Sequence, residues 1–225
     1  MKKPTNLKEF FKIYKIIPLD PKIYELALTH ASYNPNGDKQ NNNYEQLEFL
    51  GDAVLQFISS QYIYRNYPEL AQGYQTRLRA KAVCTETLGE ISVNIGLIDI
   101  LKTGPGQMEK DVKDSPKVKA DIFESMIGAI YIDLGLKAAV DFVSHHIYPV
   151  IDKVHTESNK DAKSELQEYF QSFSKENIKY ITEQGANRQF FSKAVHDEQI
   201  FGKGYGSSKK EAELNAAKNA LEKLK

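Results

Sequence analysis

The sequence predicts a multidomain protein in which a larger all-α domain is followed by a smaller α+β domain of order α-β-β-β-α. Apolar residues recur at helical spacing up to about residue 151. Beyond it, three short alternating segments are bounded by turn residues, as strands are. Between these regions, residues 153–160 lose apolar side chains and gain Ser, Asn and charge, which is typical of a linker. We therefore place the domains at 1–152 and 161–225, joined by the linker 153–160.

The first domain is expected to consist of helices separated by Pro and Gly breaks. Its periodic segments are about 7–14, 23–29, 43–66, 76–83, 85–95, 117–132 and 136–151. The breaks between them contain Pro18, Pro21, Pro68, Gly73, Gly96 and Gly135. Two polar stretches, 34–43 and 102–116, are expected to be exposed loops.

The second domain is expected to contain a helix at 161–171, strands at 178–182, 190–195 and 198–205, and a closing helix at 208–224. Ser208 and Glu211 have the spacing of a capping box, so the closing helix should begin just after Ser208. Lys209 and Lys210 then lie in its first turn, where the helix dipole disfavours positive charge. Two ammonium groups, free backbone N–H groups and a glycine-rich loop predict a phosphate-binding site. A nucleotide-binding P-loop is the alternative, but its Gly-Lys-Ser/Thr ending is absent, so no nucleotide cofactor is expected.

Composition restricts the possible functions. The 225 residues include 30 Lys and Arg and 30 Asp and Glu, so any nucleic-acid surface must be a local patch. The single cysteine, Cys84, can form neither an intramolecular disulfide nor a Cys-based metal site, which favours a reducing, cytoplasmic setting. Lysines interrupt the N-terminal apolar residues, so neither a signal peptide nor a membrane span is expected.

One helix, at 43–57, carries acids on a single face. At about 100° per residue, Glu45, Glu48 and Asp52 share a narrow arc. The opposite stripe should face the core and consists of Leu47, Leu50, Val54, Phe57 and Ile58. The ordinary interpretation is the solvated face of an amphipathic helix. However, Phe49 and Leu55 border the arc, and no Lys or Arg lies at i±3 or i±4, so the carboxylates require a counter-ion.

A second acidic pair lies in the helix at 117–132, which is apolar nearly all round and should therefore be buried. Asp121 and Glu124 interrupt it on adjacent turns, and acids are rarely buried unless they are paired or metal-bound. Gly128 continues the same face and leaves room for something to approach. Oxygen ligands favour Mg²⁺ over zinc, which would require His or Cys. The neighbouring His145 and His146 do not face each other on a helix and are poor candidates for a joint metal site.

These two helices carry a resemblance to a known family. Tyr44-Glu-Gln-Leu-Glu-Phe-Leu-Gly-Asp-Ala-Val-Leu resembles the signature helix of the ribonuclease III family, and Ala120-Asp-Ile-Phe-Glu-Ser-Met-Ile-Gly-Ala resembles its second acidic helix. The resemblance implies an endoribonuclease that leaves staggered ends with 5′-phosphate and 3′-hydroxyl groups. Its implied substrates are rRNA precursors and some mRNA and tRNA precursors.

The same resemblance implies roles for the acids. Glu48, Asp121 and Glu124 would hold Mg²⁺, for which Mn²⁺ can substitute. Asp52 and Glu124 would position or activate the attacking water. Glu45 would be an auxiliary acid beside these four.

The second domain resembles a double-stranded RNA-binding domain. Ser164-Glu-Leu-Gln-Glu-Tyr is similar to its first motif, and Gly202-Lys-Gly-Tyr-Gly-Ser-Ser-Lys-Lys-Glu-Ala-Glu is similar to its third. Such domains contact 2′-hydroxyl and phosphate groups and recognise A-form shape more than sequence. The residues implied in RNA binding are Gln167, Arg188, Lys209 and Lys210. The first domain also has a basic helix face, which consists of Arg77, Arg79 and Lys81. This face is either simply exposed to solvent or lies beside the RNA.

Three positions depart from the family pattern. Gln46 stands where bacterial members often have Arg, and Gln72 stands where many have an acid beside the scissile phosphate. Gly185-Ala-Asn-Arg lacks the Pro and His that are usual in the RNA-binding loop. A neutral Gln72 argues against a role of that position in metal binding, and Arg188 is expected to replace the missing His contact with a phosphate contact.

The assembly prediction rests on Phe49. This large aromatic residue lies off the core stripe and beside the acidic arc, so its exposure would be unfavourable without a partner. We expect a homodimer in which each Phe49 enters the other catalytic domain, as the resemblance also implies. A module that binds structured RNA without cutting it is the competing hypothesis, and the presence of all four core acids argues against it.

Overall fold

The computed structural model describes residues 3–34, 42–70, 72–185 and 189–224. The chain forms two compact units, Met1–Asp152 and Lys153–Lys225, and each is described by itself. The first unit is helical and the second has the order α-β-β-β-α, so the expected fold class is confirmed. No helix among the described residues is long and apolar enough to cross a membrane.

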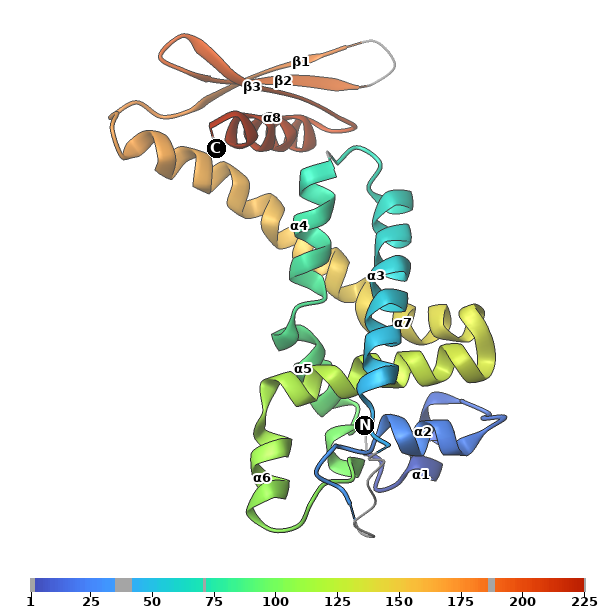
Figure 1. Ribbon diagram of the computed structural model, residues 1–225. Coiled ribbons are helices and arrows are strands. Elements are labelled where there is room, and N and C mark those ends of the chain that lie inside the picture. The colour runs from blue at the N-terminus through green and yellow to red at the C-terminus, as the bar shows by residue number, and fades with distance from the viewer. Residues whose placement is uncertain (1–2, 35–41, 71, 186–188, 225) are drawn as a thin grey trace. The chain divides into compact units, whose positions relative to one another are not determined.

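Helices make up the first unit (Figure 1), and most begin and end within a few residues of the predicted bounds. They are α1 (Leu7–Tyr14), α2 (Pro21–Ala27), α3 (Glu45–Asn66), α4 (Gln72–Ala82), α5 (Thr85–Asn94), the 3-10 helix η1 (Ile98–Ile100), α6 (Gln107–Asp114) and the first part of α7 (Pro116–Gln171).

The prediction of an exposed loop at 102–116 was wrong, because α6 occupies the middle of this stretch. Val112 is the buried residue of α6. On the exposed side of the helix, Lys113 Nζ lies 2.8 Å from Glu109 Oε1 on the preceding turn. The Gly-Pro-Gly sequence and the mixed charge of the stretch favoured a loop. A single buried Val in so short a helix is a weak periodic signal.

The helix α7 turns sharply at Gly135, whose φ of 80° and ψ of 178° are not helical. Glycine adopts such a conformation without a Cβ clash, and Figure 1 shows α7 turning back on itself in its yellow portion. Past this point α7 remains helical through 153–160, the segment interpreted as the linker. Ser, Asn and charged residues occur in helices as well as in connectors, so composition alone did not identify the helix.

The buried face of α3 differs from the predicted stripe: Leu50, expected in the core, is only half-buried, and Leu55, expected to border the acidic arc, is fully buried. Phe57, expected in the core, is 52% exposed. The buried residues instead follow a face that includes two small residues: Leu47, Gly51, Val54, Leu55, Ile58, Ser59 and Ile63. A pattern built only from large apolar side chains omits Gly51 and Ser59, so it rotated the stripe toward Phe57.

Carboxylates on α7 anchor the rest of the first unit. Asp133 accepts hydrogen bonds from the backbone N–H of Leu19 at 3.0 Å and of Asp20 at 2.8 Å, and from the Tyr24 hydroxyl at 2.8 Å. Farther along α7, Asp152 accepts from two tyrosine hydroxyls near the end of α3, those of Tyr62 and Tyr67. The two bonds to Asp152 fix the end of α3 against α7.

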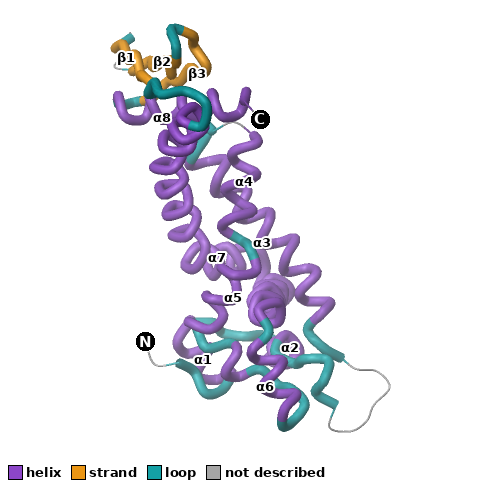
Figure 2. Tube along the Cα trace, turned by 90° about the vertical axis from the view of Figure 1, so that its left-hand side faces the viewer, coloured by secondary structure: helices purple, strands orange, loops and turns teal. Residues whose placement is uncertain are grey.

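The second unit is a three-stranded antiparallel sheet covered on one face by helices (Figure 2). The strands are β1 (Lys179–Gln184), β2 (Phe190–His196) and β3 (Gln199–Gly206), in the order β1-β2-β3, and the closing helix is α8 (Lys209–Leu224). Asp197 and Glu198 both have positive φ at the two-residue β2–β3 turn, as in a type I′ hairpin. The core between sheet and helices contains residues of α7, β2 and α8, among them Leu166, Phe170, Ala194, Ala216 and Ala220.

Candidate functional site

The candidate site lies where α3 and α7 cross in direct backbone contact. A Cβ added to Gly51 would collide with the carbonyl oxygen of Glu124, and one added to Gly128 would collide with that of Leu47. Only glycine therefore fits at either position of this crossing. Gly128 was expected to leave room for something to approach, and what approaches is the backbone of α3.

This crossing brings together three carboxylates that are far apart in the sequence. Glu48 comes from α3, and Asp121 and Glu124 come from successive turns of α7. One oxygen from each side chain lies within 4.8 Å of the other two. Asp121 is only 6% exposed, whereas Glu48 and Glu124 are partly buried. These are the three acids that the family resemblance assigned to a metal, and hard oxygen donors at this spacing suit a small divalent cation.

The other two acids of α3 lie outside this three-acid group. Asp52 is exposed, and its carboxylate accepts a hydrogen bond from Gln56 Nε2 at 3.2 Å. Its charge nevertheless raises the pKa of Glu124, so it lies near enough to act on the group. Glu45 is exposed in the first turn of α3, and its backbone N–H donates to Asn43 Oδ1 at 2.9 Å.

Burial and mutual repulsion together disfavour the charged forms of these acids. Burial, and then the charges of Asp52, Asp121 and Glu48, raise the pKa of Glu124 to about 8. The pKa of Glu48 is also raised, by burial first and then by the charge of Asp121. With a pKa of about 8, the Glu124 carboxyl is largely protonated near neutral pH, because its charged form is partly buried beside other carboxylates. The group is therefore arranged to receive a further positive charge.

Two residues that the sequence analysis did not assign contact Asp121. Lys117 Nζ lies 2.6 Å from Asp121 Oδ2 and 3.4 Å from Glu48 Oε1, and these contacts raise its pKa. The Tyr44 hydroxyl donates to Asp121 Oδ2 at 3.3 Å from a nearly buried position. The i,i+4 spacing could have identified Lys117. No local signal pairs Tyr44 with a residue 77 positions away.

The basic face of α4 divides between structural and exposed residues. Arg79 donates to Ser60 Oγ at 2.7 Å, so its guanidinium is held against α3. The Arg77 guanidinium lies 5.3 Å from the centre of the Tyr74 ring and is exposed, as is Lys81. Gln72 is exposed at the first position of α4.

In the second unit, Lys209 and Lys210 are exposed in the first turn of α8, as expected. Ser208 Oγ accepts from the backbone N–H of Glu211 at 3.2 Å, which is one half of the predicted capping box. The other half is shifted by one residue, because the Glu211 carboxylate accepts from the backbone N–H of Ser207 at 2.6 Å.

The other predicted RNA-binding residues differ in accessibility. The side-chain amide of Gln167 is used within its own unit: Nε2 donates to Asn177 Oδ1 at 2.8 Å, and Oε1 accepts from the backbone N–H of Ile178 at 3.0 Å. Its contact with RNA stays a prediction. Arg188 lies outside the described residues.

Phe49 is 81% exposed within the first unit, which agrees with its expected place off the core stripe. It lies next to Glu48 in the first turns of α3. A side chain of this size exposed beside an acidic group is a candidate for burial by a partner.

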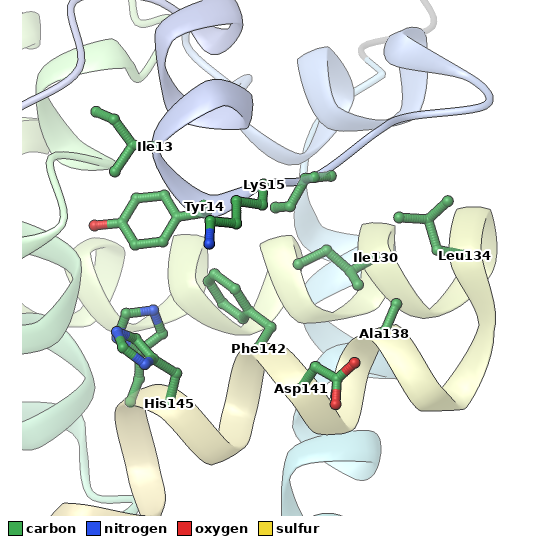
Figure 3. A pocket seen from close by; sticks show the side chains of 11 residues that line it. Ile13, Tyr14, Lys15, Ile130, Leu134, Ala138, Asp141, Phe142 and His145 are labelled. Atoms are coloured by element: carbon green, nitrogen blue, oxygen red, sulfur yellow. The ribbon is translucent and has the colours of Figure 1, made fainter.

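A cavity of about 380 Å³ lies between α1 and α7 (Figure 3). Its lining includes Ile13, Tyr14, Ile130, Leu134 and Phe142, together with His146, and none of the candidate acids lines it. Burial lowers the pKa of His146 to about 4, so this imidazole is neutral at physiological pH. Because none of the candidate acids lines it, the cavity is separate from the acid group.

Comparison with known proteins agrees with this geometry. A family model described as ribonuclease-III-like matches residues 20–151, and one described as a double-stranded RNA binding motif matches residues 162–224. Ribonuclease 3 of Mycoplasmopsis synoviae (strain 53) is 43% identical over 98% of this chain and 95% of that protein. This chain belongs to the ribonuclease III family.

Further relatives support this membership. Ribonuclease 3 of Bacillus cereus (strain G9842) is 37% identical over 98% of this chain and 94% of that protein. Among solved structures, the nuclease domain of ribonuclease III from Campylobacter jejuni has a TM-score of 0.57 and 27% identity, and the match covers 66% of this chain and 97% of that one. The chain is thus an endoribonuclease of the ribonuclease III type with a double-stranded RNA-binding domain.

Proposed function

We propose that this ribonuclease III hydrolyses both strands of double-stranded RNA with the help of Mg²⁺, and that Mn²⁺ can substitute. The products are staggered ends that carry 5′-phosphate and 3′-hydroxyl groups. The observation that carries this proposal is the group formed by Glu48, Asp121 and Glu124, whose oxygens lie within 4.8 Å of one another.

The donor set fits Mg²⁺ rather than a softer metal. All three ligands are carboxylates, and Mg²⁺ prefers oxygen donors with positions left for water and substrate phosphate. The pKa of Glu124, raised to about 8 by burial and then by the neighbouring carboxylates, supports the same assignment because a bound cation would stabilise the charged carboxylate. When bound, Mg²⁺ lowers the pKa of water and neutralises charge that develops at phosphorus.

The protein residues orient the reaction. Asp52, which is exposed on α3 one turn beyond Glu48, and Glu124 position the attacking water and accept its proton. The Tyr44 hydroxyl and the Lys117 ammonium hold Asp121 through the bonds at 3.3 and 2.6 Å. Such partners fix a ligand carboxylate in one orientation before the substrate arrives.

The second unit supplies affinity for the duplex. Lys209 and Lys210 stand exposed at the N-terminus of α8, where backbone N–H groups and the helix dipole also favour a phosphate. Contacts of this kind fix the protein on A-form RNA with little dependence on base sequence. Gln167 and Arg188 are proposed to complete this surface.

We also propose that the active form is a homodimer in which Phe49 is buried by the partner. Its 81% exposure beside the acid group supports this assembly, and a two-fold axis would use the residue twice. The Campylobacter jejuni nuclease domain is described as having a region involved in dimer formation. Two acid groups facing one duplex would each cut one strand, which produces the stagger.

The natural substrates proposed are rRNA precursors and some mRNA and tRNA precursors, processed in the cytoplasm. Similarity to ribonuclease 3 proteins along nearly the full chain supports this assignment. Depletion of the protein should therefore cause unprocessed rRNA precursors to accumulate. Normal maturation of rRNA in depleted cells would contradict this part of the proposal.

The direct test is incubation of the purified chain with a long RNA duplex, with and without Mg²⁺. We expect cleavage only with the metal, with a matched single strand and a matched DNA duplex left intact. Mapping both ends of each product should give 5′-phosphates, 3′-hydroxyls and a stagger. Duplex binding without cleavage at any concentration of Mg²⁺ or Mn²⁺ would favour the competing RNA-binding function.

A further inference from the structure

Within the second unit, helices pack on one face of the sheet, and the sequence of β3 explains which side chains lie on the other face. A Cβ added at Gly202, Gly204 or Gly206 would lie too close to atoms of α8. Glycine at alternate positions thus lets α8 pack directly on β3. The residues between them, Lys203 and Tyr205, point to the opposite face and are exposed.

The strand register places two aromatic rings and two cations together on this outer face. Phe191 of β2 is paired with Tyr205 of β3, and Lys193 is paired with Lys203. The two ring centres are 4.7 Å apart, and Lys193 Nζ lies 5.4 Å from the centre of the Phe191 ring. We call Phe191, Lys193, Lys203 and Tyr205 the outer sheet patch.

The exposure of the patch exceeds what the stability of the sheet requires. A cross-strand aromatic pair stabilises a sheet by itself, yet Tyr205 remains 65% exposed. Ile181 on β1 and Ile200 on β3 are also about half exposed. An exposed surface with aromatic and apolar side chains of this kind is typical of a binding site.

The charges around the patch indicate the chemistry of its partner. By strand alternation, the outer face carries Lys179, Lys193 and Lys203 against one acid, Glu183, among the described strand residues. The whole chain has no net charge, so this positive balance is local. A polyanion is therefore favoured over an apolar protein surface, which would gain nothing from the lysines.

An aromatic pair whose Tyr205 ring is exposed beside ammonium groups fits a polyanion that carries accessible planar rings, which is unpaired RNA. A duplex does not fit this description, because its bases are stacked inside the helix. The proposed duplex site at Lys209 and Lys210 belongs to α8, which packs on the other face of the sheet. We propose that the outer sheet patch binds an unpaired RNA strand, with bases stacked on Tyr205 and Phe191 and phosphates at Lys193 and Lys203.

This inference deepens the proposed function and rests on it in one respect: the unpaired strand is taken to be a single-stranded flank of the duplex substrate. One domain would then hold the duplex through α8 and the flank through the sheet. Substrates with a flank would bind more tightly than blunt duplexes of the same length, because the second contact is intramolecular.

The test measures binding of a fluorescein-labelled oligouridylate to the full chain in the presence of a chelator. Tyr205→Ala should weaken binding about tenfold, because one stacking contact is lost. Tyr205→Phe keeps the ring and should bind like the wild type. Lys193→Ala combined with Lys203→Ala should flatten the dependence of log affinity on log salt by about 1.4.

Matched controls separate this surface from its alternatives. Ile181→Ala removes an exposed apolar side chain from the same face without removing a ring, and it should leave oligouridylate binding unchanged. Lys209→Ala with Lys210→Ala should weaken blunt-duplex binding and spare oligouridylate binding. Photocrosslinking of a 5-bromouridine oligomer should map to Phe191 or Tyr205.

Three results would overturn the inference. The first is oligouridylate binding that is unaffected by Tyr205→Ala. The second is a loss of oligouridylate affinity for Ile181→Ala that equals the loss for Tyr205→Ala. The third is a Tyr205→Ala protein that sediments at lower mass than the wild type, which would assign the face to a second copy of the chain. Cleavage of a blunt duplex is measured separately. A wild-type protein that fails to cut blunt duplex contradicts the proposed function, whereas the oligouridylate result decides the sheet patch alone.

Discussion

Replacing Gly51 with Ala should disrupt the site without touching any acid. The added Cβ would collide with the carbonyl oxygen of Glu124 and would lie only 3.0 Å from the backbone nitrogen of Gly128. Both neighbours are backbone atoms of α7, so no side chain can turn aside to make room. The helices must therefore separate, and interhelical distance follows the size of the residues at the contact. Glu48 on α3 would move away from its two partners on α7.

The expected magnitudes follow from this geometry. Forcing an extra carbon into a packed core costs about 1–3 kcal/mol of unfolding free energy. A displacement of roughly 1 Å in a catalytic group can lower the rate about a hundredfold. The matched control is Gly73→Ala in α4, where the nearest atom to the added Cβ is Arg77 Nη1 at 3.8 Å. That change should leave activity intact and raise stability by up to about 1 kcal/mol, because Ala restricts the unfolded chain.

Urea unfolding of both variants gives the stability change, and calorimetric titration with Mg²⁺ in the absence of RNA gives the metal affinity. We expect Gly51→Ala to unfold at lower urea, to bind Mg²⁺ weakly and to cut a duplex slowly, with Gly73→Ala close to the wild type in binding and cleavage. A Gly51→Ala protein with wild-type stability and activity would refute the inferred backbone contact between α3 and α7.

Three further outcomes are expected. Because burial and the neighbouring carboxylates raise the pKa of Glu124 to about 8, its proton competes with the metal, and calorimetric Mg²⁺ affinity should be about 50-fold weaker at pH 6 than at pH 8; equal affinities would contradict this. The same raised pKa should make the metal-free protein lose stability as the pH rises from about 4.5 to about 8, with no further loss above that range. Phe49→Ala should shift the sedimenting species toward monomer and depress cleavage, since each buried Phe contributes about 1.5–3 kcal/mol; an unchanged dimer would show that Phe49 does not mediate association. Lys209→Ala with Lys210→Ala should flatten the salt dependence of duplex binding by up to about two units of slope, whereas Lys223→Ala at the other end of α8 should not. Equal effects of these changes on the slope would contradict a phosphate site at the first turn of α8.

The sequence identified the acid group because its members break strong patterns. Glu48 lies on an acidic arc with no Lys or Arg at i±3 or i±4, and Asp121 and Glu124 interrupt a helix that is apolar nearly all round. Such breaks are visible at helical spacing before any tertiary structure is known. Gly51 was not singled out, because a glycine carries no hydrophobic signal, and only the contact with α7 shows why a side chain is excluded there.

Other features depend on long-range packing and could not be read from local pattern. The Tyr44 hydroxyl reaches Asp121 only because α3 and α7 cross, and Asp133 binds backbone N–H groups more than a hundred residues earlier. Phe57 fits the apolar stripe by type but not by position, since the buried face of α3 is set by the close approach at Gly51. Hydrophobicity alone thus located α3 but not its rotation about its axis.

The central claim is that Glu48, Asp121 and Glu124 hold the metal that cuts the duplex, and Glu124→Gln tests it most directly. This change removes a ligand charge but little volume, and Glu45→Gln on exposed α3 surface is the matched control. Cleavage of one long RNA duplex in Mg²⁺ and binding of the same duplex in chelator are measured for both variants. We predict that Glu124→Gln binds the duplex like the wild type and does not cut it, while Glu45→Gln retains most of the activity. Cleavage by Glu124→Gln at near the wild-type rate would contradict the claim.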